Sequence, residues 1–143
     1  MTRIFLDANV LFSAAYSPAG RGRALFRLAD IGRCTLVASP HVIEEASRNL
    51  KVKAPDRLAE LDELLALVER VREAPPKIVA WSRSKELPDN DAPVLAAAAA
   101  SGADILVTGD RTHFGHLFNR TVGGVTVRSL RRTLSALLEI DEA

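Results

Sequence analysis

Short apolar runs alternate with amphipathic segments along the whole chain. The runs are rich in β-branched and other apolar residues, as buried strands are, and they occupy Ile4–Leu6, Thr35–Ala38, Lys77–Trp81, Ile105–Thr108 and Val125–Val127. Strands that alternate with helix-like segments favour a parallel sheet joined by crossover helices. The pattern therefore predicts an α/β protein, and the right-handed crossover rule gives the order 3-2-1-4-5 for these five strands.

Four helices are expected between these strands. The first follows Pro18, and the second begins with Ser39 as its N-cap and a proline at its first helical position. The third carries apolar residues at three- and four-residue spacing over Leu58–Val71, and the prolines of "APPK" end it. The fourth begins near Asn90 and runs through a series of alanines to Gly102, a typical C-cap residue.

The length and composition of the chain are typical of a single globular domain. The 143 residues are 48% hydrophobic and 26% charged, which predicts a single globular domain over residues 1–143. The net charge is +1, so any binding of phosphate must come from local clusters of cations. Cys34 is the only cysteine, which excludes an internal disulfide and a cysteine-based zinc site. No segment resembles a signal peptide or a membrane span, and we expect a cytoplasmic protein without membrane contact.

Several acidic residues fall near the carboxyl ends of the predicted strands. Asp7 follows the first strand and is flanked by apolar runs, where a bare carboxylate is costly unless a positive partner lies beside it. Asp110 follows the fourth strand. In the predicted order, the first and fourth strands are neighbours, and the order of the strands in the sheet reverses between them. We therefore expect Asp7 and Asp110 to face each other, with Asp91 and either Glu44 or Glu45 close by.

Carboxylates that converge on one crevice repel one another unless a cation lies between them. Hard divalent ions such as Mg²⁺ or Mn²⁺ take carboxylate oxygens as ligands and keep positions open for phosphate. Asn9, Ser39 and Thr108 lie beside the acids and are suited to orient the carboxylates or water. Each acid alone is typical of a helix cap or turn, and only their joint occurrence predicts a metal site.

Four motifs in series resemble those of a known family. The segments "FLDANVL", "VASPHVIEEASRNL", "PDNDAPVLAAAAASGADILVTGD" and the "RTHF" that follows are similar to those of PIN-domain ribonucleases, in particular the toxin components of type II toxin–antitoxin systems. The resemblance extends from Ile4 to about Leu130. It implies a three-layer α/β/α sandwich and the hydrolysis of RNA phosphodiester bonds with Mg²⁺ or Mn²⁺. It also implies an antitoxin protein as partner and a homodimer.

The resemblance assigns roles to individual residues. Asp7, Asp91 and Asp110 match the metal-binding aspartates of the family, and Asn9 and Thr108 match polar residues near its metal. Glu45 matches the helix acid better than Glu44, because the family places an apolar or small residue directly after the acid, as Ala46 is here. These four acids, with Glu45 as the fourth, are therefore the expected catalytic and metal-binding residues.

Residues outside the acidic set have weaker signals. Arginine suits phosphate because its planar fork binds two oxygens, and Arg21, Arg23 and Arg111 follow loops that should border the crevice. We expect these three to contact RNA. His113 follows Asp110 closely, and we interpret it as an exposed loop residue. Trp81 is interpreted as an apolar anchor.

Two other functions remain open from the sequence. A haloacid-dehalogenase-type phosphatase also uses a strand-end aspartate and a late "GD", but its second aspartate, the general acid, is replaced by Asn9 here. A non-catalytic module that binds RNA or protein is the other alternative. The release of free phosphate would favour the phosphatase, and metal-independent binding of RNA would favour the module.

Overall fold

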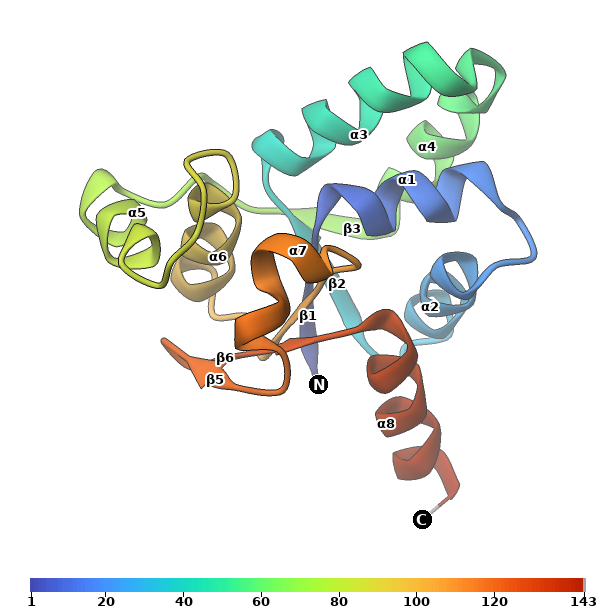
Figure 1. Ribbon diagram of the computed structural model, residues 1–143. Helices are drawn as coiled ribbons and strands as arrows, with labels where there is room; N and C mark the ends of the chain where they lie inside the picture. Colours follow the sequence, from blue (N-terminus) through green and yellow to red (C-terminus); the bar gives the residue numbers. More distant parts are fainter. Residues whose placement is uncertain (143) are drawn as a thin grey trace.

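A mainly parallel sheet forms the centre of the molecule in this computed structural model, which describes the backbone of residues 1–142 and the side chains of residues 1–139 (Figure 1). Its strands are β1 (Arg3–Leu6), β2 (Thr35–Ala38), β3 (Val68–Arg70), β4 (Ile105–Val107), β5 (Thr121–Val122) and β6 (Val125–Arg128). Their order is β3-β2-β1-β4-β6-β5, and only the β5–β6 pair is antiparallel. The predicted reversal between β1 and β4 is thus confirmed.

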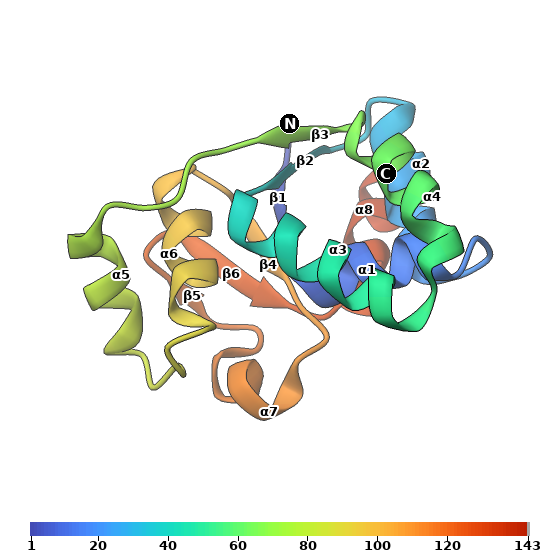
Figure 2. The same cartoon turned by 90° about the horizontal axis from the view of Figure 1, so that it is seen from above.

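Helices cover both faces of the sheet and complete a three-layer α/β/α sandwich (Figures 1 and 2). They are α1 (Ala8–Tyr16), α2 (Arg21–Asp30), α3 (Pro40–Lys53), α4 (Leu58–Leu65), α5 (Pro76–Arg83), α6 (Ala92–Ala100), α7 (Arg111–Phe114) and α8 (Leu130–Glu142). Helices α5 and α6 lie on one face, and α1, α2, α4 and α8 lie on the other (Figure 2). Because both faces are covered, the residues of β1 and β4 from Ile4 to Leu6 and at Leu106 are fully buried.

One predicted strand is wrong. Residues Lys77–Trp81 lie inside helix α5, because Pro76 takes the first helical position after an extended Pro75. The third strand of the sheet is instead β3, which the sequence pattern placed at the end of a long third helix. That helix ends at Leu65, and Val68 pairs with Leu36 of β2. Only the first residue of this edge strand is buried, so the strand has too few apolar residues to give a strand pattern.

The pattern also missed helices α1, α7 and α8 and strand β5. Helix α1 begins directly after Asp7, whereas the first helix was expected only beyond Pro18, where α2 lies. Strand β5 forms a hairpin with β6 through Gly123 and Gly124, whose φ angles are 58° and 81°. These positive φ values favour glycine, which explains the two adjacent glycines in the turn.

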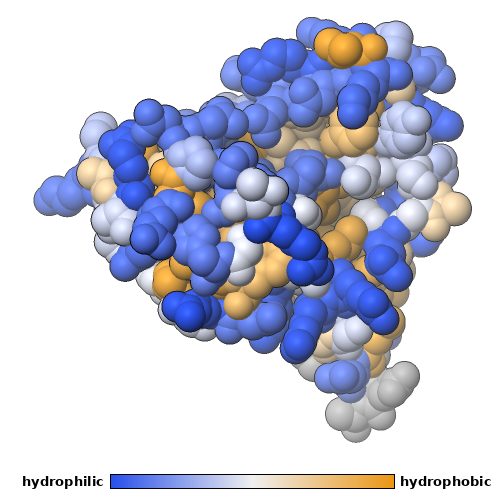
Figure 3. All heavy atoms as spheres, in the orientation of Figure 1, coloured by the Kyte–Doolittle hydropathy of each residue, from blue (hydrophilic) through white to orange (hydrophobic). Residues whose placement is uncertain are grey.

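The outer surface is mainly hydrophilic in the view of Figure 3, and a hollow opens between the α3 and α7 sides of this face. The carboxyl ends of β1 and β4 point toward this region. Within the part of the chain that the structure describes, no helix is both long and apolar enough to cross a membrane.

Candidate active site

Asp7 connects the sheet to the first helix. Its backbone N–H donates to the Val107 carbonyl (3.0 Å), which continues the pairing of β1 with β4. Its Oδ1 accepts from the Ala8 N–H (2.8 Å) and so caps α1, and its Oδ2 accepts from the Thr108 hydroxyl (2.7 Å). The side chain is buried, since only 3% of the residue is exposed. The carboxylate is therefore fixed in place by the fold itself.

Asn9 and Thr108 hold the loop after β4 against the start of α1. Asn9 Nδ2 donates to Asp7 Oδ2 (3.2 Å), and Asn9 Oδ1 accepts from the Gly109 N–H (2.8 Å). The Thr108 hydroxyl, which donates to Asp7, also accepts from the Asp110 N–H (3.0 Å). Through these contacts, two polar side chains set the position of Asp110 relative to Asp7.

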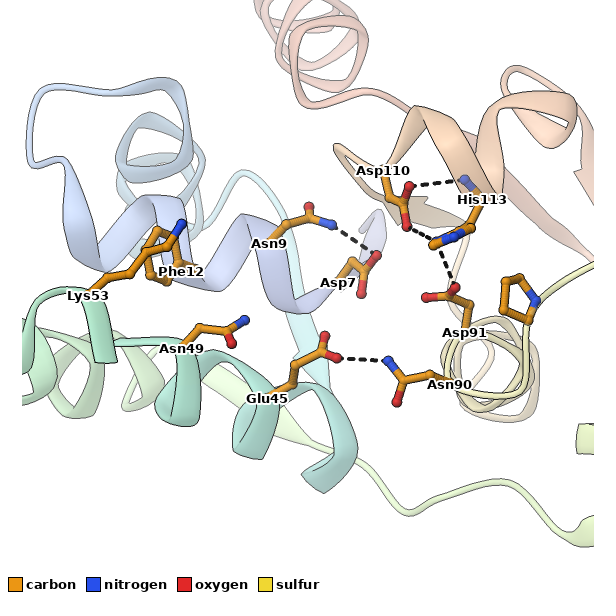
Figure 4. Close-up of a pocket in the computed structure, with 11 residues that line it drawn as sticks. Asp7, Asn9, Phe12, Glu45, Asn49, Lys53, Asn90, Asp91, Asp110 and His113 are labelled. Atoms are coloured by element: carbon orange, nitrogen blue, oxygen red, sulfur yellow. Dashed lines mark hydrogen bonds and ion pairs between the residues drawn. The ribbon is translucent and has the colours of Figure 1, made fainter. Parts of the chain in front are cut away.

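Asp91 and Asp110 meet at His113. His113 Nδ1 lies 2.8 Å from Asp110 Oδ2 and 3.1 Å from Asp91 Oδ2, so one ring nitrogen faces two carboxylates (Figure 4). Asp110 Oδ1 also accepts from the His113 N–H (3.0 Å) and caps α7. Asp91 occupies the N-cap position of α6, but its side chain makes no capping bond. It turns toward the other acids instead.

Helix α3 supplies Glu45 from the opposite wall. Glu45 Oε1 accepts from Asn90 Nδ2 (2.8 Å), and the carboxylate points toward Asp7 (Figure 4). Glu44 is exposed and lines a separate shallow depression with Ser47 and Arg48. Of the two glutamates, only Glu45 therefore faces the other acids.

The four acids line one pocket of about 540 Å³ together with Asn9, Asn49, Asn90 and His113, and with Phe12, Lys53 and Pro88. Burial raises the pKa of the Asp7 carboxyl to about 6, and the charges of Asp91 and Glu45 add to the rise, although hydrogen bonds from Thr108 and Ala8 oppose it. Burial also raises the pKa of Asp91, which His113 counteracts. Among the described residues, no lysine or arginine pairs with these four acids.

The donor set of this pocket fits a divalent cation. Ligand atoms of Asp91, Asp110 and His113 lie within 4.8 Å of one another, and the carboxylates of Asp7 and Glu45 face the same space. Carboxylate oxygens are the ligands that suit Mg²⁺ or Mn²⁺. A cation would also relieve the repulsion that raises the pKa of Asp7.

His113 and Ser39 differ from the sequence interpretation. His113 is exposed, as interpreted, but it lies in a helix and not in a loop, and it lines the pocket because the short helix α7 brings residue 113 back over Asp110. The three-residue spacing from a strand-end aspartate was the signal that could have placed it there. Ser39 occupies the N-cap position of α3, yet its fully buried Oγ makes no hydrogen bond within the described residues. It therefore orients none of the four acids.

The three arginines expected at the crevice take different positions. Arg21 and Arg111 line a neighbouring pocket of about 440 Å³ with Arg131, on the other side of the Gly109 loop. The Arg111 guanidinium lies 5.3 Å from the ring centroid of Phe118. Arg23 lines neither pocket, because it donates to the Ala14 carbonyl and pairs with Glu60 of α4. The expectation that Arg23 contacts substrate is therefore corrected to a structural contact between helices.

Together these features define an α/β protein whose acidic pocket lies at the strand-order reversal, the place where open α/β sheets bind their ligands. The chain belongs to the PIN domain family, because residues 3–112 match the family described as PIN domain. A comparison of the sequence with curated proteins found no match.

Solved structures share the fold at low sequence identity. PAE2754 from Pyrobaculum aerophilum has a TM-score of 0.69 at 19% identity, over 96% of this chain and 96% of that chain. VapBC2 from Rickettsia felis, bound to a promoter DNA fragment, has a TM-score of 0.67 at 18% identity, over 90% of this chain and 98% of that chain. VapC20 from Mycobacterium tuberculosis, a sarcin-ricin loop cleaving toxin, has a TM-score of 0.55 at 15% identity, over 76% of this chain and 91% of that chain.

Proposed function

We propose that the protein is a metal-dependent endoribonuclease that hydrolyses RNA phosphodiester bonds with Mg²⁺ or Mn²⁺. One observation carries the proposal: four acids from separate segments, Asp7, Glu45, Asp91 and Asp110, line a single pocket. Membership of the PIN domain family supports it, as does the similarity of the fold to that of a toxin that cleaves the sarcin-ricin loop.

The chain's own residues have distinct roles in this proposal. Asp7, Glu45, Asp91 and Asp110 would hold the ion, and Asn9 and Thr108 fix the Asp7 carboxylate in its ligand position. A bound divalent ion lowers the pKa of water and offsets charge on the phosphate. His113 Nδ1 lies against both Asp91 and Asp110, so the ring bridges these two carboxylates and fixes their relative position. One of the pocket carboxylates accepts the proton of the attacking water.

The neighbouring basic pocket suits the RNA backbone. Arg21, Arg111 and Arg131 line it together with Ser13, Ser17 and Ser129. Planar guanidinium groups and hydroxyls are the groups that bind phosphate oxygens. Because Thr108 and Gly109 border this pocket and Asp110 follows them, a strand bound there would continue into the acidic pocket.

We further propose that the protein is a cytoplasmic toxin that forms a homodimer and binds an antitoxin protein. The structural similarity to VapBC2 and to VapC20 supports this proposal. A phosphatase of the haloacid-dehalogenase type is disfavoured, because Asn9 donates to Asp7 and accepts from Gly109 and has no proton to give as a general acid. A module that only binds RNA is distinguished from the nuclease by the experiment below.

The test is RNA cleavage by the purified protein with and without Mn²⁺, beside Asp7→Asn. We expect shortened RNA that requires the metal, and loss of cleavage by at least about a hundredfold in the variant, because removal of one ligand weakens both metal binding and orientation. Glu44→Gln is the matched control for Glu45→Gln, and only the latter should lose activity. Free phosphate as the product, or equal cleavage by Asp7→Asn, would contradict the proposal.

A further inference from the structure

An aromatic pair on α1 borders the acidic pocket. Phe12 and Tyr16 lie one helical turn apart, with ring centroids 5.5 Å apart and ring planes that differ by only 13°. Phe12 lines the pocket, and Tyr16 is 51% exposed. Lys53 of α3 lines the same pocket with its Nζ 5.7 Å from the Phe12 centroid. Phe12 and Lys53 lie at the end of the pocket away from Asp91 and His113 (Figure 4).

Tyr16 lies outside the apolar core, and Phe12 is only partly buried against it. Phe5, Phe26 and Phe114 are fully buried and provide the large aromatic side chains of the interior. Tyr16, the only tyrosine of the chain, stacks on Phe12 and leaves half of its surface in water. An exposed aromatic side chain that is held in a fixed plane by a second ring is a preformed surface for stacking.

We infer that Tyr16, backed by Phe12, stacks on a base of the RNA that the proposed function places in the acidic pocket. Phe12 and Tyr16 follow Asp7 by five and nine residues, which corresponds to about 7 Å and about 13 Å along the helix axis. The stacked base therefore belongs to a nucleotide beside the cleaved bond rather than to the one at the metal. The inference depends on the proposed function for the identity of the ligand.

The surroundings of the pair favour RNA over a protein partner. The ring of Phe12 is bordered by the Lys53 ammonium, and Asn49 lines the pocket one turn earlier on α3. A cation and polar groups around stacked rings match a base with its phosphate, because single strands are bound by stacking together with backbone charge. An apolar helix of a partner protein would need an apolar surround instead.

The experiment combines Tyr16→Ala with single abasic nucleotides in the RNA. The cleaved bond of a short single-stranded RNA is first mapped with the wild-type protein and Mn²⁺. Labelled RNAs with one abasic position on either side of that bond then bind the protein in the Asp7→Asn background, and fluorescence anisotropy gives each Kd. We expect one abasic position to raise Kd by about fivefold to about a hundredfold, the range of a single base–aromatic stack. Tyr16→Ala should raise the Kd for intact RNA by the same factor. In this variant the abasic nucleotide should cause no further rise in Kd.

Control variants separate stacking from folding. Tyr16→Phe should stay within about twofold of the parent Kd, because it keeps the ring. Ile31→Ala removes another exposed apolar side chain, on the distant end of α2, and should leave Kd unchanged. An unchanged Kd in Tyr16→Ala, or an abasic penalty that persists in it, would overturn the inference and assign this surface to a protein partner. Absence of cleavage by the wild-type protein would instead contradict the proposed function, so the two failures are distinct.

Discussion

A single carboxyl group serves two purposes at Asp7, and they conflict. The helix start needs an acceptor for the Ala8 N–H, which the buried Oδ1 supplies. The pocket needs a charged ligand, but burial raises the pKa of the group to about 6. In the absence of a metal, ionised Asp7 therefore lowers the stability of the fold.

This conflict predicts how the stability of the metal-free protein depends on pH. An unfolded aspartate has a pKa of about 3.9, so the folded state holds the Asp7 proton more tightly. The stability that this group contributes is present below about pH 4 and is lost as the pH rises through about 6. The free energy of unfolding of Asp7→Asn relative to wild type should therefore increase from pH 4 to pH 7 by up to about 3 kcal/mol.

Urea unfolding with a chelator present measures this difference at each pH. Asp62→Asn, an exposed acid on α4, is the control and should give a difference that is flat with pH. A flat difference for Asp7→Asn as well would show that the buried carboxyl is not the cause.

The candidate site was predictable as far as its residues lay in motifs. The aspartates follow apolar runs at strand ends, so sheet topology alone brings Asp7 and Asp110 together. Position 113 could not be assigned in the same way, because the side-chain direction of His113 depends on a four-residue helix that no periodicity reveals. The contact that Arg23 makes could not be predicted either, because its partner Glu60 lies 37 residues away along the chain.

At the scale of elements, the sequence pattern predicted the buried strands and misplaced the edge. The central strands β1, β2 and β4 are apolar and buried apart from their first residues Arg3 and Thr35, and they were recognised. Edge strand β3 exposes Glu69 and Arg70, whereas α5 contains an apolar run that packs on α6 and so resembled a strand. The local sequence pattern cannot distinguish an exposed edge strand from a short apolar helix, because the neighbouring elements decide which side chains of each become buried.

The β5–β6 hairpin gives a prediction at this scale. A Cβ on Gly123 would lie 2.4 Å from Trp81 of α5, whereas a Cβ on Gly124 would meet nothing within 4 Å. Both residues have positive φ, so Gly124→Ala should lose about 1 kcal/mol from strain alone. Gly123→Ala should lose a further 1–3 kcal/mol, roughly, because the ring must move.

Chemical unfolding measures both variants, and the emission of Trp81, the only tryptophan, reports the local change. The emission should shift in Gly123→Ala and stay as in wild type in Gly124→Ala. Equal losses of stability in the two variants would mean that α5 does not press on the hairpin.

For the whole molecule, the net charge of +1 conceals a separation of charge. The acids gather in one pocket, and Arg21, Arg111 and Arg131 gather in the next. Under the proposed function, attraction of RNA would therefore depend on a few local cations and not on the total charge.

This arrangement predicts a weak dependence of RNA affinity on salt. Each phosphate contact to a single strand contributes about −0.7 to the slope of log K against log salt, so these arginines with Lys53 give a slope of about −3. Arg21→Gln should reduce its magnitude by about 0.7. Arg23→Gln is the matched variant, because its side chain is bound to Glu60 and lies outside both pockets. It should lower the thermal unfolding midpoint and leave the slope unchanged, and a reduced slope would place it on the RNA path.

Under the proposed function, the capping role of Asp7 also limits which substitutions at this position would remove the activity and still leave a folded protein. Asparagine begins a helix as well as aspartate does, so an Asp-to-Asn codon change at this position silences the pocket and preserves the start of α1. Alanine or valine there would silence it too, at a further cost of about 1 kcal/mol for the lost cap. Inactive descendants that still accumulate in the cell are therefore expected to carry asparagine at this position.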